Sequence, residues 1–418
     1  MGKVITAIDL GEKYIKIAQG EKIDRNKINI LGVSLVETSN IKKHVVIDLE
    51  GLTYELEEGI RNLEQLSGFD VESVYISISG EGTEIVNAEG YTVIKDPENG
   101  VSQIDIDSIE SQLENINTNS INKEKLDTII VEYIIDDTKK NIKNPINMPG
   151  MKLEAKAIIM RSDKNLIKNY RKIFEDILGI KINKFILASR AAEEAVLTPE
   201  DRELGVMLLD IGYAYSNIYI IKENKPITYG YLPLGSWLFV NDIKKVLDIS
   251  ISEANKILKK YNNIDSPESL ETIQYTKKSG EVSEIEYKMI RDIIYSRLKY
   301  NFDYIKKEFF NKNTLQKLSI SDLDSGIVLV GGGSKLKFID NLLSSITKTN
   351  VRIGEVEGLK GYEEFLKDPQ FANVFGVLKL ASKNDSFKIE KKKSDDVKID
   401  MRLKSILDWI NKYFREIF

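Results

Sequence analysis

Two short segments about 200 residues apart carry the same order of strand, aspartate and glycine, and this repeat constrains the fold more than any other feature. In VITAIDLGEKYIKIAQG, a β-branched run leads to Asp9, turns at Gly11 and resumes with alternating side chains. In GVMLLDIGYAYSNIYII, an apolar run leads to Asp210, turns at Gly212 and resumes in the same way. Each segment predicts a β-hairpin. Their separation is too long for a solenoid repeat and fits a duplicated domain.

A third glycine turn follows another apolar strand. In SGIVLVGGGSKLKFIDNLLSSI, residues 327–330 predict a strand that leads into three consecutive glycines. The apolar residues that follow recur at helical spacing, at Leu336, Ile339, Leu342 and Leu343. The triplet therefore predicts a helix N-terminus that is kept clear of side chains.

Together the three turns predict a nucleotide site, although each alone usually marks only a connection. Glycine has no Cβ, so two such turns let backbone N–H groups approach a phosphate chain from opposite sides. Asp9 and Asp210 would hold a hydrated Mg²⁺ ion, and the third turn would cover the adenosine. The segment GYLPLGSW lacks the lysine of a P-loop, and no G-x-G-x-x-G follows a strand, which excludes the P-loop and Rossmann interpretations.

Composition excludes several other classes of protein. The 418 residues, 42% of them hydrophobic, predict two to four domains, and a net charge of -5 offers no basic footprint for nucleic acid. The absence of cysteine excludes disulfides, thiolate zinc sites and a cysteine nucleophile, and fits a reducing compartment. The only histidine, His44, is expected to be solvated or structural rather than catalytic. No signal peptide or run of eighteen apolar residues is present, so we expect neither secretion nor a membrane span.

The three turns resemble the actin-like ATPase superfamily, which implies an α/β fold of two duplicated halves around a nucleotide cleft. Further segments narrow the resemblance to the FtsA family of cell-division proteins, and it extends from Val4 to the C-terminal helix. These segments are LTPEDRELGVMLLDIG (197–212), IKNPINMPGMKLEA (142–155), VRIGEVEGLKGY (351–362) and FANVFGVLKLA (371–381).

The resemblance implies a domain map. The first half would comprise residues 1–83 and 161–195 (subdomain 1A), interrupted by an inserted subdomain, 84–160 (1C). The second half would comprise 196–228 and 303–382 (2A), enclosing a small subdomain, 229–302 (2B). A flexible charged linker, 383–400, and an amphipathic membrane-targeting helix, 401–418, would follow. Within the insert, DIDSIESQLENI predicts a helix with Asp105 or Asp107 as its N-cap.

The expected cofactors are ATP and Mg²⁺, with Asp9 and Asp210 holding the metal through water. The expected nucleotide-contacting residues are Asp9, Gly11, Glu12, Lys13, Tyr14, Asp210, Gly212, Tyr213, Ser216, Lys256, Gly331, Gly332, Gly333 and Ser334.

Several positions depart from the pattern of this family. Glu12 stands where a small hydroxyl residue is usual, so we expect its carboxylate to point outward, with Lys13 offsetting its charge. The second turn carries Tyr213 and Tyr215 in place of a glycine run and threonine. Where related ATPases place a polar residue that positions water, this chain has only Leu187 and Ala188, while Glu193 and Glu194 read as a solvated helix face. ATP binding with weak ATPase activity at most is therefore predicted, and no catalytic residue is assigned.

The resemblance also implies protein partners. The small subdomain would bind the acidic, apolar C-terminal peptide of FtsZ, for which Arg291, Arg297 and Lys299 on a predicted helix are candidate contacts; a solvated basic face is the alternative. The inserted subdomain would serve contacts along a filament of the protein itself and with later division proteins.

The last segment, MRLKSILDWINKYFREIF (401–418), predicts an amphipathic helix. It is too short to span a bilayer but suits the headgroup plane of an anionic membrane; packing on its own domain is the alternative, disfavoured by the polar linker before it. The family resemblance implies the membrane, on the cytoplasmic face at the division septum. The apolar stripe with its flanking tryptophan consists of Leu403, Ile406, Leu407, Trp409, Ile410, Tyr413, Phe414 and Ile417.

Two other functions remain open. A pilus-assembly actin-like ATPase of the PilM type would share the body and insert but bind a transmembrane partner and lack the amphipathic C-terminus. A metabolic kinase of the same superfamily would need a sugar site and a catalytic base, and the sequence shows neither.

Overall fold

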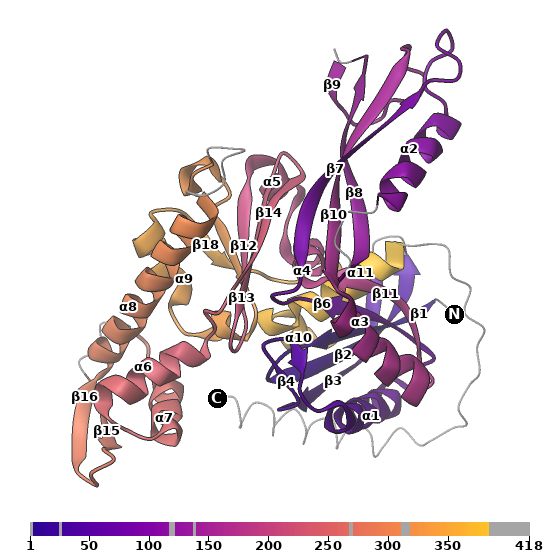
Figure 1. The fold of residues 1–418 in the computed structure, drawn as a ribbon. Helices are drawn as coiled ribbons and strands as arrows, with labels where there is room; N and C mark the ends of the chain where they lie inside the picture. The colour runs from indigo at the N-terminus through magenta and orange to yellow at the C-terminus, as the bar shows by residue number, and fades with distance from the viewer. Residues whose placement is uncertain are drawn as a thin grey trace.

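A computed structural model of the chain describes residues 3–24, 27–116, 122–136, 139–266, 271–310 and 318–383. Figure 1 shows two α/β halves side by side, with an inserted sheet projecting from the first half and a small helical subdomain projecting from the second. None of the helices within these ranges combines the length and apolarity that crossing a bilayer requires.

The first half is built on a six-stranded sheet of order β11-β6-β1-β2-β3-β19. Strands β1 and β2 form the antiparallel hairpin that the first Asp-x-Gly segment predicts. Because side chains alternate along a strand, Ile8 and Ile17 face α1 and α3 on one side, while Ala7 and Ala18 face α11 on the other. The strands are β1 (Val4–Leu10), β2 (Tyr14–Asp24), β3 (Lys27–Glu37), β6 (Ser73–Ile78), β11 (Lys181–Leu187) and β19 (Leu359–Lys360). The helices are α1 (Leu49–Ser67), α3 (Lys164–Arg171), α10 (Glu363–Leu366) and α11 (Ala372–Lys383), with the π-helical turn η1 (Lys172–Ile177).

The inserted subdomain is a four-stranded sheet of order β7-β10-β8-β9 with one helix, α2, packed on it. Helix α2 (Gln103–Asn115) begins after Ser102, and Asp105 closes a capping box from the third helical position. The prediction of Asp105 or Asp107 as N-cap is therefore wrong, because Ser102 precedes both and supplies the cap. The strands are β7 (Glu84–Val93), β8 (Lys123–Ile135), β9 (Lys139–Ile142) and β10 (Lys152–Asp163).

The second half repeats the first with a five-stranded sheet of order β14-β13-β12-β17-β18. Strands β12 and β13 form the second predicted hairpin, and β17 pairs with β12 in parallel. Helices α8 and α9 cover the outer face, and the small subdomain consists of α6, α7 and the β15–β16 hairpin. The strands are β12 (Val206–Ile211), β13 (Ser216–Lys222), β14 (Lys225–Leu232), β15 (Thr272–Thr276), β16 (Val282–Glu286), β17 (Ile327–Val330) and β18 (Val351–Ile353). The helices are α6 (Trp237–Leu247), α7 (Ile251–Tyr261), α8 (Tyr287–Ile305) and α9 (Ile339–Thr347), with short turns at η2 (Lys306–Phe310), η3 (Ile320–Asp322), η4 (Gly332–Lys335) and η5 (Pro369–Phe371).

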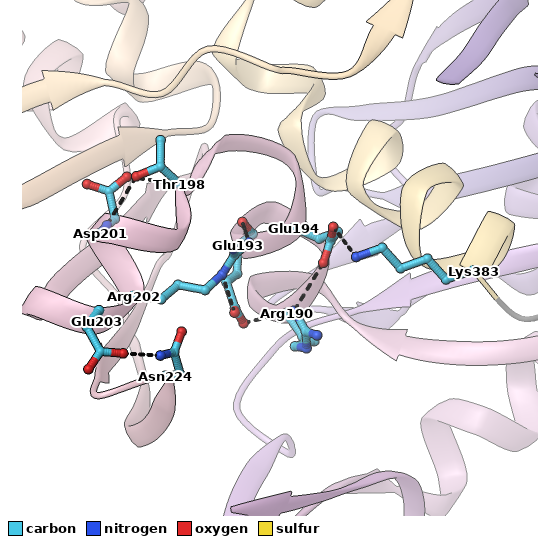
Figure 2. Close-up of polar contacts among 9 residues, drawn as sticks. All are labelled: Arg190, Glu193, Glu194, Thr198, Asp201, Arg202, Glu203, Asn224 and Lys383. Carbon is cyan, nitrogen blue, oxygen red and sulfur yellow. Dashed lines mark hydrogen bonds and ion pairs between the residues drawn. The ribbon is translucent and has the colours of Figure 1, made fainter. Parts of the chain in front are cut away.

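Two short helices, α4 (Ala188–Val196) and α5 (Pro199–Leu204), join the halves. Figure 2 shows Glu193 between two guanidinium groups: its carboxylate lies 3.1 Å from Arg190 and 3.0 Å from Arg202. Glu193 is only 7% exposed, so its interpretation as part of a solvated face is wrong. Helix α4 is covered on several sides, because α11 packs against it and Lys383 lies 2.6 Å from Glu194.

Candidate functional site

A cavity of about 810 Å³ lies where the glycine turns of the two halves meet the small subdomain. Its walls include the β1–β2 turn, the β12–β13 turn and the three consecutive glycines after β17, together with α6 and α7. The volume lies within the usual range for small-molecule sites. Thirty-two residues line the cavity, twelve of them from the predicted set: Asp9, Gly11, Glu12, Lys13, Tyr14, Asp210, Gly212, Tyr213, Lys256, Gly331, Gly332 and Gly333.

Asp9 ends the apolar part of β1 and is already paired with a cation. Lys16 is its register partner on β2, and the Lys16 Nζ lies 2.7 Å from the Asp9 Oδ2. The Ser77 hydroxyl donates to the Asp9 Oδ1 at 2.5 Å. Lys16 is not among the residues that the sequence analysis predicted for the site. Its position opposite Asp9 in the predicted hairpin would have indicated it.

Asp210 ends β12 in an equivalent place but has a different environment. It is 6% exposed, and the Asn373 amide donates to its Oδ2 at 3.0 Å. Burial raises the pKa of Asp210, and the nearby charge of Asp9 acts in the same direction. A divalent cation at this end of the cavity would therefore relieve a buried negative charge that neutral hydrogen-bond donors only partly offset.

The two carboxylates fit a hydrated Mg²⁺ ion better than a fully protein-bound metal. Within the described ranges no group of three acidic or histidine side chains is gathered as a metal site. Mg²⁺ commonly keeps several waters and uses one or two carboxylates, so Asp9 and Asp210 are a sufficient protein contribution.

Close packing explains the glycines in two of the turns. Gly331 has φ of 85°, and a Cβ there would lie 2.2 Å from the Asp210 Oδ1. Gly212 donates its N–H to the Tyr215 carbonyl at 2.8 Å, and a Cβ there would meet the same oxygen. The helix expected directly after the glycine triplet begins later, because Gly332–Lys335 form a 3₁₀ turn and α9 starts at Ile339.

In the β1–β2 turn, the carboxylate of Glu12 is held by a backbone hydrogen bond. The Glu12 Oε1 accepts a hydrogen bond from the His44 backbone N–H at 3.0 Å, and burial raises the pKa of Glu12. The expectation that the Glu12 carboxylate points outward is therefore wrong, because Glu12 lines the cavity. Lys13 does not pair with it; its Nζ lies 5.2 Å from the ring centroid of Tyr14 and 5.6 Å from that of Tyr213.

The two predicted serines serve the local fold instead of lining the cavity. The Ser216 hydroxyl donates to the Leu234 carbonyl, and that of Ser334 to the Gly331 carbonyl, each at 2.6 Å. Lys256 does line the cavity from α7, with its Nζ 3.2 Å from Glu253.

Several lining residues carried no recognisable sequence signal. His44 enters from the short hairpin of β4 (Ile41–Lys42) and β5 (Val45–Val46), far from the glycine turns in sequence. The other polar or aromatic lining residues outside the predicted set include Ser79, Asn217, Trp237, Gln370 and Asn373.

The proposed peptide contacts on α8 do not form one open cationic face. Arg297 is bound to Asp242 of α6, with an Nη2 to Oδ1 distance of 2.7 Å. Arg291 is paired with its neighbour Asp292, whereas Lys299 is exposed.

The predicted apolar stripe from Leu403 to Ile417 lies outside the described residues.

Comparisons with known proteins agree on one family. A family model described as "Cell division protein FtsA" matches residues 207–376, and one described as "SHS2 domain inserted in FTSA" matches residues 80–160. The cell division protein FtsA of Borreliella burgdorferi is 27% identical over 413 residues, which cover 97% of each chain. The FtsA of Escherichia coli K12 is 24% identical over 422 residues, covering 99% of this chain and 98% of the relative.

Solved structures show the same fold at low identity. A PilM–PilN type IV pilus biogenesis complex superposes with a TM-score of 0.58 at 14% identity, covering 91% of this chain and 98% of the other. MreB5 of Spiroplasma citri bound to AMPPNP superposes with a TM-score of 0.53 at 11% identity, covering 90% and 96%. These likenesses establish an actin-like fold and do not favour the pilus alternative, because the two sequence models, which together match more than half of the chain, both describe FtsA. The chain belongs to the FtsA family of cell-division proteins.

Proposed function

We propose that this protein binds ATP with Mg²⁺ in the cleft between its halves. The observation that carries the proposal is the shared cavity, in which both Asp-x-Gly turns and the glycine triplet meet. Asp210 and Asp9 would hold the hydrated metal, which would neutralise phosphate charge, and Lys16 is placed to exchange its bond to Asp9 for a phosphate oxygen. The small subdomain would cover the base with Trp237 and Lys256.

Calorimetry with ATP in the presence and absence of Mg²⁺ tests this site. We expect saturable binding that requires the metal, and no measurable binding under either condition would contradict the proposal. Turnover is expected to be slow, since Leu187 and Ala188 are each 1% exposed and present no polar group to water.

We further propose that the protein polymerises and tethers FtsZ filaments to the cytoplasmic face of the cell membrane at the division septum. The stripe from Leu403 to Ile417 would insert among the lipid headgroups, as its period and flanking cations favour. Sedimentation with anionic liposomes compares the full chain with one ending at Asp400; equal pelleting of the two would contradict membrane targeting.

The small subdomain is proposed to hold the FtsZ C-terminal peptide. Lys299 is the most accessible of the three candidate cations, while Arg297 must first release Asp242. We expect Lys299→Glu to weaken peptide binding in a pull-down. Retention of the FtsZ peptide by the wild type also separates this function from that of a pilus-assembly protein.

Self-association and the recruitment of later division proteins are proposed for the inserted subdomain. It exposes three large apolar side chains, Tyr91 and Val93 on β7 and Met151 just before β10, at 62–68%. Introducing aspartate at Tyr91 is expected to reduce filament formation, which sedimentation and electron microscopy would measure.

A further inference from the structure

The only histidine of the chain, His44, lies between the β1–β2 turn and the β12–β13 turn, the first and second phosphate turns of the proposed nucleotide site. His44 and its neighbour Lys43 both have positive φ, 56° and 52°, in the tight connection between β4 and β5. This connection carries the imidazole from the surface of the first half to the cavity, where it lines the same wall as Asp9, Gly11 and Gly212.

His44 is fixed to the first half through its backbone and one ring nitrogen. Its N–H donates to the Glu12 carboxylate at 3.0 Å, which ties it directly to the first phosphate turn. Its Nδ1 lies 3.3 Å from the Ser79 hydroxyl. Gly80 lies against the side chain so closely that a Cβ there would come 2.7 Å from the His44 Cβ.

The imidazole ring contacts the second half through two tyrosines. Its centroid lies 5.7 Å from the Tyr215 ring and 5.6 Å from the Tyr231 ring. The two tyrosine rings are stacked on each other at 4.5 Å, with 19° between their planes. Tyr215 belongs to the second phosphate turn, where its carbonyl accepts the Gly212 N–H.

We propose that His44 is a positioning residue that clamps the second phosphate turn against the first through Tyr215. The inference rests on the proposed nucleotide site. Glu12, His44 and Tyr215 form one chain of contacts from the first turn to the second, along the wall of the cavity. The phosphate end of a bound nucleotide is then enclosed by a contact that must open before the nucleotide can leave.

Release of a fluorescent ATP analogue, measured with Mg²⁺ by stopped flow, tests the clamp. Loss of one aromatic contact of this kind corresponds to a release rate about tenfold higher, which we expect for both His44→Ala and Tyr215→Ala. His44→Phe retains a ring and should restore slow release. The double variant His44→Ala, Tyr215→Ala should release nucleotide more slowly than the product of the two single effects predicts, because each single variant already removes the contact between His44 and Tyr215.

Tyr362→Ala is the matched control, since it removes an aromatic contact of similar geometry outside the cavity, with Phe365 at 6.1 Å. It should release nucleotide at the wild-type rate. If nucleotide binds and His44→Ala releases it at the wild-type rate, the clamp is overturned while the proposed function stands.

A second measurement needs no nucleotide. Because the chain has one histidine, the imidazole Hε1 signal in the proton NMR spectrum reports on His44 alone. Tyr215→Ala removes an aromatic ring that contacts the imidazole and should shift this signal in the empty protein, whereas Tyr362→Ala should not. If the wild type binds no nucleotide, the proposed function fails, and an unmoved signal in Tyr215→Ala then overturns the clamp as well.

Discussion

The two cleft aspartates, equivalent in the duplicated fold, should respond oppositely to neutralisation. Asp9 compensates Lys16, so Asp9→Asn leaves a buried ammonium without its partner and should lower the free energy of unfolding by about 3 kcal/mol. Asp210 is an acid whose pKa is raised by burial, so its ionised form costs stability at neutral pH, and Asp210→Asn should raise that free energy. Urea denaturation at pH 7 measures both, and destabilisation of similar size in the two variants would contradict the asymmetry.

The lowered pKa of His44 predicts that the protein loses stability in acid. Burial lowers its pKa from 6.5 to about 4, with Lys16 acting in the same direction against Asp9. Between these values the unfolded chain binds a proton that the folded chain does not, so the free energy of unfolding falls as the pH is lowered from 6.5 to 4 and is unaffected above that window. The expected loss is about 3 kcal/mol. Denaturation at several pH values should show it in the wild type and a correspondingly smaller loss in His44→Gln.

At the scale of elements, the carboxylate of Glu193 links the two helices that join the halves. Glu193 pairs with both Arg190 and Arg202, so Glu193→Gln leaves two largely buried guanidinium groups near each other with only Glu194, 3.7 Å from Arg190, to offset them. We expect a loss of about 3 kcal/mol in the free energy of unfolding. Glu203→Gln, at an exposed position on α5 where the carboxylate meets Asn224, is the control and should change stability by less than about 0.5 kcal/mol. Equal effects of the two substitutions would rule out this role.

Elements with a strong local pattern were predictable from the sequence, and contacts between distant elements were not. Alternation and the Asp-x-Gly turns predicted both hairpins, which the structure confirms. The environment of Glu193 depends on α11 packing against α4 and on Arg202 of α5 reaching back to it, and no local spacing encodes either contact. The position of His44 at the cavity could not be predicted for the same reason, since a short hairpin carries no sign that its tip enters a cleft.

At the scale of the whole molecule, an ion pair within the described ranges joins the inserted subdomain to the second half. The Glu132 carboxylate of β8 lies 3.0 Å from the Lys225 ammonium of β14. Lys225→Glu places two carboxylates together and should broaden the distribution of distances between the inserted subdomain and the second half. Since the chain has no cysteine, spin labels on cysteines introduced at Ile104 and Val246, both exposed, would report this separation without background.

Two further variants make that measurement specific. Lys277→Glu disrupts an exposed pair within the small subdomain and should leave the distance distribution unchanged. Because Glu132 also pairs with Lys156, combining Lys225→Glu with Glu132→Lys and Lys156→Glu restores opposite charges at both contacts and should narrow the distribution again. A distribution that stays narrow in Lys225→Glu would show that the ion pair does not hold the two parts together.

The ion pair between Lys383 and Glu194 has a mechanical consequence. Lys383 is the last described residue of α11, and Glu194 lies on the helix that joins the halves. A pull on residues 384–418 would therefore act at once on the first half, on whose sheet α11 packs, and on the joining helix α4. If the chain is held by its C-terminal end while a force acts on its body, part of that force would be transmitted to the helix that joins the halves.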